Sequence, residues 1–339
     1  MPFQITIEPS GRTCVAEEGV AILRAALDAG LILPYGCRNG ACGACKGRVI
    51  SGRIDYGFAE PGALSEEDRA DGLALFCCAK PLTDLVIECR ELASDSDFPV
   101  RTLPARVQKL ERLAPDVMAL SLKLPTNEHF LFLAGQYIEI LLPDGKRRAF
   151  SLANAPADEE LLQLHIRRVP GGRFTEHVFT TMKERDILRF EGPHGNFYLR
   201  DGSAKPIIFL AGGTGFAPIK AIVEDALHNH CDRPMTLYWG ARERSSLYLP
   251  DLPGQWAAAY PNFNYVPVIE QGYRDDERHG LVHLAVLEDF PDLSDHQAYA
   301  CGAPLMIDAA RRDFVAHGLE EDEFFADAFS FASDCEVRA

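Results

Sequence analysis

The sequence lacks the features of a membrane-bound or secreted protein. A membrane-spanning helix needs about 18 consecutive apolar residues, and the apolar runs here are short stretches such as IIFLAGG at residues 207–213. The first residues, MPFQITIEPS, contain no basic segment followed by an apolar one, so no secretory signal is visible. We therefore expect a cytoplasmic protein whose ten cysteines are not used for structural disulfides.

Basic side chains are also scarce. Lys and Arg number 34 against 50 Asp and Glu, and the net charge of −16 argues against binding to nucleic acids or anionic membranes. The acidic excess is uneven, because residues 101–201 carry 15 basic and 13 acidic side chains whereas residues 202–339 carry 10 and 22. The middle of the chain would therefore repel a phosphate-bearing ligand least.

The 339 residues suffice for two or three domains, and three segments differ in pattern. Residues 1–93 combine short strands with a helix predicted over residues 20–31, and a polar linker follows over residues 94–100. Residues 101–201 contain short alternating strands such as QYIEILLP, which predict a small antiparallel β-barrel. In residues 202–339, apolar strands alternate with helical stretches, which is typical of a doubly wound parallel sheet.

Four cysteines have the spacing of an iron–sulfur site. Cys37, Cys42 and Cys45 form the pattern C-x4-C-x2-C, and Cys77 follows after 31 intervening residues. This is the plant-type [2Fe–2S] spacing, in which four thiolates hold two irons. A structural zinc site is the main alternative, but zinc usually favours paired C-x2-C motifs. Small residues let the backbone wrap a cluster and direct N–H groups at its sulfurs; they are Gly36, Gly40, Ala41, Gly43 and Ala44.

A basic and aromatic segment follows a predicted strand in the middle of the chain. Arg148-Ala149-Phe150-Ser151 resembles the R-x-Y-S motif of the ferredoxin–NADP reductase superfamily. The resemblance implies that Arg148 pairs with the flavin pyrophosphate, which a guanidinium matches bidentately. It further implies that Phe150 lies along the ring and that Ser151 donates to N5, stabilising charge that arrives with a hydride. Phe150 replaces the usual tyrosine, so a hydroxyl contact is lost.

A second segment supports this interpretation. In members of the superfamily a similar strand lines the flavin, and a glycine-rich turn with Ser or Thr cradles the pyrophosphate. The corresponding residues are His165, Ile166, Arg167, Gly171, Gly172 and Thr175. The alternative is a strand and turn with Thr175 as a helix cap and no ligand. FAD is expected rather than FMN because the domain order resembles that of FAD-binding members.

Residues 202–339 carry the signals of a dinucleotide site. Gly212-Gly213-Thr214-Gly215 links an apolar strand to a helix, which is a general anion-binding arrangement. This turn resembles the superfamily's GGTG-[FIL]-AP motif, and Arg242 lies in a segment similar to its second dinucleotide segment.

A later segment resembles the superfamily's C-G-x-P-x-M motif, through Cys301, Gly302, Pro304 and Met306. The resemblance places Cys301 beside nicotinamide C4, whereas the alternative is a buried small residue at the end of a strand. Phe329 lies in a segment similar to one that reaches the flavin ring in many members. Its alternative role is to anchor the tail in the core.

The resemblance covers nearly the whole chain and implies a multi-domain α+β and α/β protein. A β-grasp ferredoxin domain comes first, then an antiparallel β-barrel FAD domain, then a doubly wound NAD domain. The chain resembles a class of reductases that serves oxygenases, cytochromes P450 and the dideoxysugar pathway. Within this class, the reductases of the CDP-6-deoxy-Δ3,4-glucoseen type and of the phenol-hydroxylase type are particularly similar to this chain. The fourth cluster ligand is then Cys77 rather than Cys78, because LFCCAKP matches the context Leu-x-Cys-x-Ala-x-Pro.

The implied activity is electron transfer from NADH, with NADPH possible, through FAD and a [2Fe–2S] cluster to a separate protein. An oxygenase, cytochrome P450 or dehydrase is the expected acceptor, docking at an exposed loop edge around Arg38, Asn39 and Ala41; Arg38 could instead brace the loop. One alternative is a stand-alone NAD(P)H:flavin or quinone reductase. The other is a redox sensor, against which the complete nucleotide and flavin motifs argue.

Overall fold

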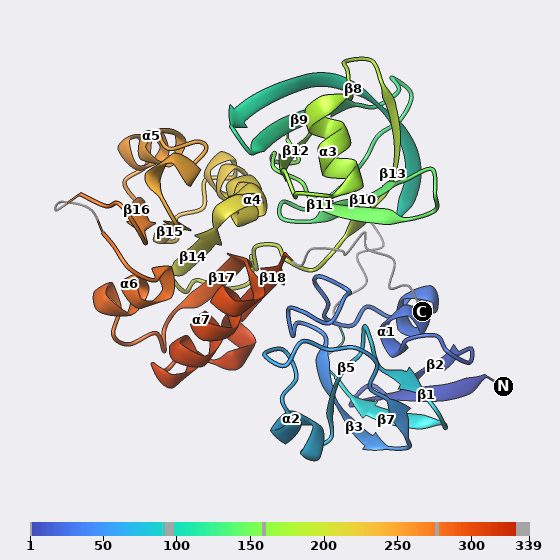
Figure 1. Cartoon of the computed structure of the whole chain (residues 1–339). Helices are drawn as coiled ribbons and strands as arrows, with labels where there is room; N and C mark the ends of the chain where they lie inside the picture. The colour runs from blue at the N-terminus through green and yellow to red at the C-terminus, as the bar shows by residue number, and fades with distance from the viewer. Residues whose placement is uncertain (1, 90, 92–97, 158–160, 275–277, 330–339) are drawn as a thin grey trace. The chain divides into compact units, whose positions relative to one another are not determined.

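The computed structural model describes residues 2–89, 91, 98–157, 161–274 and 278–329. These residues form two compact units (Figure 1). The first unit consists of residues 1–96 together with 326–330, and the second begins at residue 97. Of the expected linker 94–100, residues 94–97 lie outside the described residues. The predicted boundary between barrel and dinucleotide domain falls within the second unit, so it stays a prediction.

The first unit is a β-grasp fold. Its elements are β1 (Phe3–Glu8), β2 (Arg12–Ala16), α1 (Ile22–Asp28), β3 (Lys46–Ser51), β4 (Ile54–Asp55), α2 (Glu66–Ala70), β5 (Leu73–Leu75), β6 (Lys80–Pro81) and β7 (Leu85–Glu88). Five strands form a sheet in the order β2-β1-β7-β3-β5, with β1 and β7 parallel and the other pairs antiparallel. Helix α1 is shorter than predicted, because the chain turns at Gly30 with φ of +73°.

The second unit begins with an antiparallel barrel. Its elements are β8 (Arg101–Ala114), β9 (Val117–Lys123), β10 (Tyr137–Leu141), β11 (Arg147–Ser151), β12 (Leu162–Arg167), α3 (Arg173–Thr180) and β13 (Ile187–His194). The strand order is β11-β10-β13-β8-β9-β12, and a bridge between Leu152 and Leu164 joins the two edges. Inward-facing residues such as Ile138, Ile140 and Phe190 are fully buried. The predicted barrel is confirmed.

A parallel sheet flanked by helices follows. Its elements are β14 (Ile207–Gly212), α4 (Phe216–His228), β15 (Met235–Ala241), α5 (Leu252–Ala259), β16 (Phe263–Ile269), α6 (Val282–Asp289), β17 (Gln297–Gly302), α7 (Pro304–Ala316) and β18 (Phe324–Ala328). The strand order is β16-β15-β14-β17-β18, and strands β14 to β17 are parallel. The order reverses at β14, so a ligand crevice is expected at the carboxyl ends of β14 and β17.

Buried contacts join the barrel to this sheet within the second unit. The Lys220 ammonium of α4 donates to the Ala153 carbonyl oxygen at 2.9 Å and contacts Glu224 at 2.7 Å. In the barrel, Gly135 has φ of +98°, and an added Cβ would overlap the Phe197 carbonyl oxygen and lie 2.8 Å from Ile222 Cδ1 of α4. Only glycine therefore allows this close approach.

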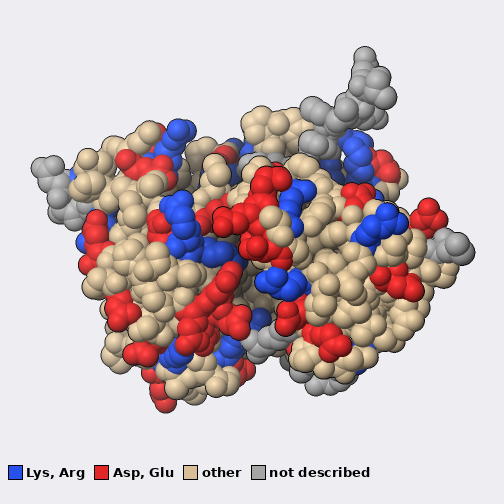
Figure 2. All heavy atoms as spheres, turned by 90° about the horizontal axis from the view of Figure 1, so that it is seen from below, with Lys and Arg blue, Asp and Glu red and all other residues tan. Residues whose placement is uncertain are grey.

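The surface matches the acidic composition. On the face shown in Figure 2, acidic side chains are abundant and basic ones occur singly or in small groups. Within the described part of the chain, no helix is long and apolar enough to cross a membrane.

We predict that Gly135→Ala destabilises the second unit far more than Gly145→Ala. Both glycines have positive φ, but nothing lies within 4 Å of a Cβ at Gly145. Gly145→Ala should cost about 1 kcal/mol of backbone strain. Gly135→Ala adds overpacking and should cost about 3 kcal/mol. Urea unfolding followed by the fluorescence of Trp239 and Trp256, both in the second unit, measures the difference. Equal losses would contradict the packing argument.

Candidate functional site

The four predicted cluster ligands lie together in the first unit. The Cys37 backbone N–H donates to Cys42 Sγ at 3.4 Å, and the Cys77 N–H donates to Cys45 Sγ at 3.4 Å. The thiols of Cys37 and Cys42 contact each other, as do those of Cys45 and Cys77. Two thiol pairs with backbone N–H groups directed at sulfur are the donor set that two irons require.

The loop backbone is shaped for this donor set. A Cβ at Gly36 would lie 3.2 Å from Cys42 Sγ, so a larger residue would crowd the thiol. Gly40 has φ of +82°, and its Cβ would lie 2.7 Å from the Phe58 carbonyl oxygen. Both glycines are therefore needed for the chain to wrap this closely, and the residues present fit a [2Fe–2S] cluster.

Electrostatics favours a thiolate at one ligand. A hydrogen bond from the Cys42 thiol lowers the pKa of Cys37 to about 6, against the cost of burial. The thiolate is the form that binds metal. Burial raises the pKa of the neighbouring Asp327 carboxyl to about 8, and the charge of Cys37 adds to this. Asp327 belongs to residues 326–330 of the same unit and lies beside Gly36; no motif indicated it.

The Cys78 thiol lies beside the four predicted ligands but belongs to neither of the two thiol pairs. Its Sγ lies 3.5 Å from Cys77 Sγ and would contact a Cβ added at Gly40. The contact of Cys77 with Cys45 supports the choice of Cys77 as the fourth ligand, which stays a prediction.

The predicted flavin residues occupy the end of β11. Ser151 is buried, whereas Arg148 and Phe150 are half-buried on the opposite side of the strand. The Phe150 ring lies 5.3 Å from the Phe174 ring of α3. The half-buried guanidinium and aromatic ring fit a phosphate-bearing aromatic ligand.

In the second flavin segment, the Thr175 side chain makes hydrogen bonds to the protein backbone. The Thr175 hydroxyl donates toward the carbonyl oxygens of Val169 and Gly172, and the Val169 N–H donates to it at 3.1 Å. Thr175 thus builds the turn of Gly171 and Gly172. A direct contact of its hydroxyl with a phosphate stays a prediction.

His165 has an unexpected partner. Its Nδ1 lies 3.0 Å from the Tyr248 hydroxyl, and both side chains are buried between the barrel and the parallel sheet. Burial lowers the pKa of His165 to about 3, and the nearby Lys220 charge adds to this. The neighbouring Ile166 is fully buried in the barrel core. No local pattern indicated this contact, because the two residues are 83 positions apart.

Two of the three dinucleotide motifs meet at the expected crevice, at the carboxyl ends of β14 and β17. A Cβ at Gly215 would overlap the Cys301 carbonyl oxygen, and a Cβ at Gly212 would lie 2.6 Å from Met306 Sδ. A Cβ at Gly302 would lie 2.8 Å from Met306 Cε. Met306 thus packs against two glycines, and the turn at residues 212–215 lies against the end of β17. The glycines let the backbones of the two motifs approach each other, and a glycine-rich strand-to-helix turn at this sheet edge fits a dinucleotide.

The other predicted residues lie around this crevice or in the tail. Thr214 lies in the turn itself, Pro304 begins α7, and Arg242 is exposed directly after β15. Cys301 is fully buried at the end of β17. Phe329 is half-buried and belongs to the segment grouped with the first unit. Its contact with a flavin ring stays a prediction.

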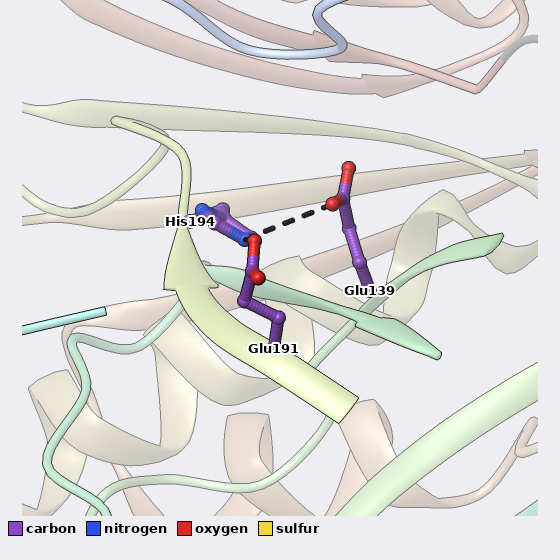
Figure 3. A group of neighbouring side chains, drawn as sticks. All are labelled: Glu139, Glu191 and His194. Atoms are coloured by element: carbon purple, nitrogen blue, oxygen red, sulfur yellow. Dashed lines mark ion pairs between the residues drawn. The ribbon is translucent and has the colours of Figure 1, made fainter. Parts of the chain in front are cut away.

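The barrel also carries a charged cluster that the sequence did not indicate. Glu139 of β10 and Glu191 of β13 are direct cross-strand partners, and His194 lies 3.5 Å from Glu191 (Figure 3). Arg147 contacts both carboxylates, at 3.0 and 2.5 Å. The single guanidinium offsets part of the negative charge of the two carboxylates, so the cluster contains an ion-pair network on the barrel.

Comparison with known proteins assigns the domains. Three family models match: a 2Fe-2S iron-sulfur cluster binding domain over residues 5–82, an oxidoreductase FAD-binding domain over residues 104–198 and an oxidoreductase NAD-binding domain over residues 209–312. The CDP-6-deoxy-L-threo-D-glycero-4-hexulose-3-dehydrase reductase of Yersinia pestis is 41% identical, with 97% of this chain and 99% of the relative covered. The chain belongs to this family of iron–sulfur flavoprotein reductases.

Other relatives of the reductase are named for different partner proteins. The phenol 2-monooxygenase reductase component DmpP of Pseudomonas sp. (strain CF600) is 40% identical, covering 98% of this chain and 96% of the relative. The crystal structure of Amycolatopsis cytochrome P450 reductase GcoB matches with a TM-score of 0.79 and 35% identity, covering 98% of this chain and 100% of the other. The reductase thus uses [2Fe–2S], FAD and a nicotinamide dinucleotide, as expected.

We predict that Cys77→Ser loses the cluster of the reductase whereas Cys78→Ser retains it. The Cys77 thiol contacts Cys45, a predicted ligand from the cysteine loop, and the Cys77 N–H donates to Cys45 Sγ, whereas the Cys78 thiol contacts Cys77. Iron analysis and visible absorption of the purified variants measure cluster content. Loss of the cluster in Cys78→Ser with retention in Cys77→Ser would exchange the two assignments.

Acid should destabilise the second unit through His165. Its folded pKa of about 3 lies below the unfolded value of about 6.5, so only the unfolded chain takes up this proton between those values. The contribution of His165 is therefore constant above about pH 7.5 and falls by about 2 kcal/mol by pH 5. Urea unfolding from pH 7.5 to 5, monitored by tryptophan fluorescence, tests the slope. His165→Gln should reduce the slope to the part that comes from other histidines such as His283 and His296, whose pKa values burial also lowers. Substitution of the exposed His177 of α3 should leave the slope unchanged.

Proposed function

We propose that this reductase takes electrons from NADH and delivers them one at a time to a separate acceptor protein. The observation that carries the proposal is a four-thiol site for a one-electron carrier in the same chain as a flavin site and a dinucleotide site. When bound, FAD accepts a hydride from NADH, and the cluster passes the two electrons on singly. A reductase for small two-electron acceptors would gain little from the cluster.

The side chains would divide this work. Ser151 would donate a hydrogen bond at flavin N5, and Cys301 would align nicotinamide C4 for hydride transfer. Arg148 would neutralise the flavin pyrophosphate. Support comes from the burial of Ser151 and Cys301, which keeps water from the reacting atoms, and from the partial exposure of Arg148.

The acceptor is proposed to be an oxygenase, a cytochrome P450 or a dehydrase, because relatives that align over nearly their full length are named for these partner classes. The expected docking edge needs one correction. Asn39 is exposed and Arg38 is half-buried, but Ala41 is only 1% exposed and does not form an exposed edge. Phe58, which is 68% exposed beside Gly40, extends the edge in its place.

NADH is proposed as the reductant on the overall family resemblance. Glu243, exposed after β15, could accept from a ribose hydroxyl, while the neighbouring Arg242 and Arg244 could hold the 2′-phosphate of NADPH. The ratio of kcat/KM for the two reductants measures this choice, and a higher value for NADPH would overturn it.

A cytoplasmic location is also proposed, because a reducing compartment keeps ligand thiols available. Fractionation of the source cells with an antibody against the chain tests the location.

The test separates flavin reduction from acceptor reduction. Cys42→Ser removes a predicted cluster ligand, whereas Cys231→Ser changes a half-buried thiol elsewhere and serves as the control. We expect Cys42→Ser to keep NADH oxidation by ferricyanide but to lose NADH-dependent turnover of the acceptor protein. Full acceptor turnover by a variant shown to lack iron would favour the stand-alone flavin or quinone reductase.

A further inference from the structure

The Cys78 thiol contacts the fourth predicted cluster ligand without being one of the four. Its Sγ lies 3.5 Å from Cys77 Sγ, a hydrogen-bond contact in which either thiol could donate. A thiolate that binds iron has lost its proton, so Cys77 can only accept once the cluster is bound. A free cysteine keeps its thiol proton at neutral pH. In the loaded protein, Cys78 is therefore the donor of this contact.

The backbone of Cys78 is already used in a turn. Its N–H donates to the Leu75 carbonyl oxygen at 2.9 Å, and the Ala79 N–H donates to the same oxygen at 2.8 Å. Between them, the Cys77 N–H donates to Cys45 Sγ at 3.4 Å. The turn thus directs one backbone N–H at a ligand sulfur, and Cys78 can donate to a ligand only through its side chain.

Two glycines with positive φ pack against Cys78. A Cβ at Gly40, in the cysteine loop, would lie 3.0 Å from Cys78 Sγ. A Cβ at Gly57 would lie 2.5 Å from the Cys78 carbonyl oxygen and 3.4 Å from Cys78 Cβ. The half-buried thiol therefore lies between the cysteine loop and the segment that presents the exposed Phe58. Packing on both sides restricts its rotation away from Cys77.

A hydrogen bond to a ligand sulfur stabilises negative charge on the cluster. Reduction adds one electron to a group that four thiolates already hold, so the reduced state gains more from the bond than the oxidised state. Hydrogen bonds to the sulfurs are among the factors that set the potential of such clusters. A donor at Cys78 would therefore raise the reduction potential. This effect requires the proton on Cys78 Sγ and not merely a side chain of that size.

We propose that Cys78 is a positioning residue for electron transfer, which donates a hydrogen bond to the Cys77 sulfur and thereby raises the reduction potential of the [2Fe–2S] cluster. The inference rests on the proposed cluster and on Cys77 as its fourth ligand. It gives a role to the second cysteine of the adjacent pair, which the ligand spacing leaves unassigned. The cluster then accepts an electron from reduced flavin more readily than it would without this thiol.

The first test measures the midpoint potential in the full chain loaded with FAD and cluster. Cys78→Ala removes the donor, so the potential should fall. The loss corresponds to a change of about 3- to 10-fold in the equilibrium constant for one-electron reduction, or about 30 to 60 mV. Cys78→Ser keeps a hydroxyl donor and should lie closer to the unmodified chain. Cys14→Ala removes a buried thiol of β2 in the same unit and should leave the potential unchanged.

The second test detects the proton itself. After exchange into deuterium oxide, pulsed EPR of the reduced cluster records coupling to the deuterons that are hydrogen-bonded to its sulfurs. The backbone N–H groups of Cys37 and Cys77 should contribute in every variant. Cys78→Ala should lose one further coupling, which Cys78→Ser should retain. A merely structural role of Cys78 would leave these couplings unchanged.

Three outcomes would overturn the proposal. An unchanged potential in cluster-loaded Cys78→Ala would show that the thiol donates no effective hydrogen bond. Equal falls in Cys78→Ala and Cys78→Ser, with all deuteron couplings retained, would indicate a packing effect. Loss of iron from both Cys78 variants would show that Cys78 holds the cluster rather than tuning it. The proposed function fails by a different result, the absence of iron from the unmodified chain.

Discussion

The packing of the barrel against the parallel sheet is the constraint on which the flavin and dinucleotide sites depend. An ammonium group, a histidine and a glycine maintain it: Lys220 bonds to the Ala153 carbonyl, His165 contacts Tyr248, and Gly135 leaves no room for a side chain. Ala153 is two residues beyond Ser151, so Lys220 anchors the strand end that carries the predicted flavin contact. Hydride transfer requires donor and acceptor to be held at a short, fixed separation, which a loosely packed pair of domains does not provide.

Close packing of glycines and a methionine brings two motifs that are far apart in the sequence into one site. The turn at residues 212–215 and the end of β17 are far apart in sequence, yet three glycines and Met306 bring their backbones into contact. The parallel register aligns Ala211 with Cys301, which places both motifs at the same sheet edge. At this edge the glycine-rich turn leads into α4, and the N–H groups at the start of a helix can bind an anion.

Features governed by local rules were predictable from the sequence, and features governed by distant contacts were not. The cysteine spacing, the glycine-rich turn and the alternation of strands and helices each follow from short-range chemistry. The His165–Tyr248 contact and the cross-strand pairing of Glu139 with Glu191 depend on register and domain packing, which no local pattern encodes. Ala41 was expected at an exposed edge because small residues surround the cysteines, but those same small residues allow the loop to close over it.

The first unit is assembled from two stretches of chain, residues 1–96 and 326–330. Its boundaries are therefore not those of a continuous segment, and a fragment that ends before residue 326 is not the complete unit. Asp327, only 4% exposed beside Gly36, would be separated from its surroundings by such a cut. The ferredoxin part is consequently a poor candidate for transfer to another protein as a simple N-terminal cassette.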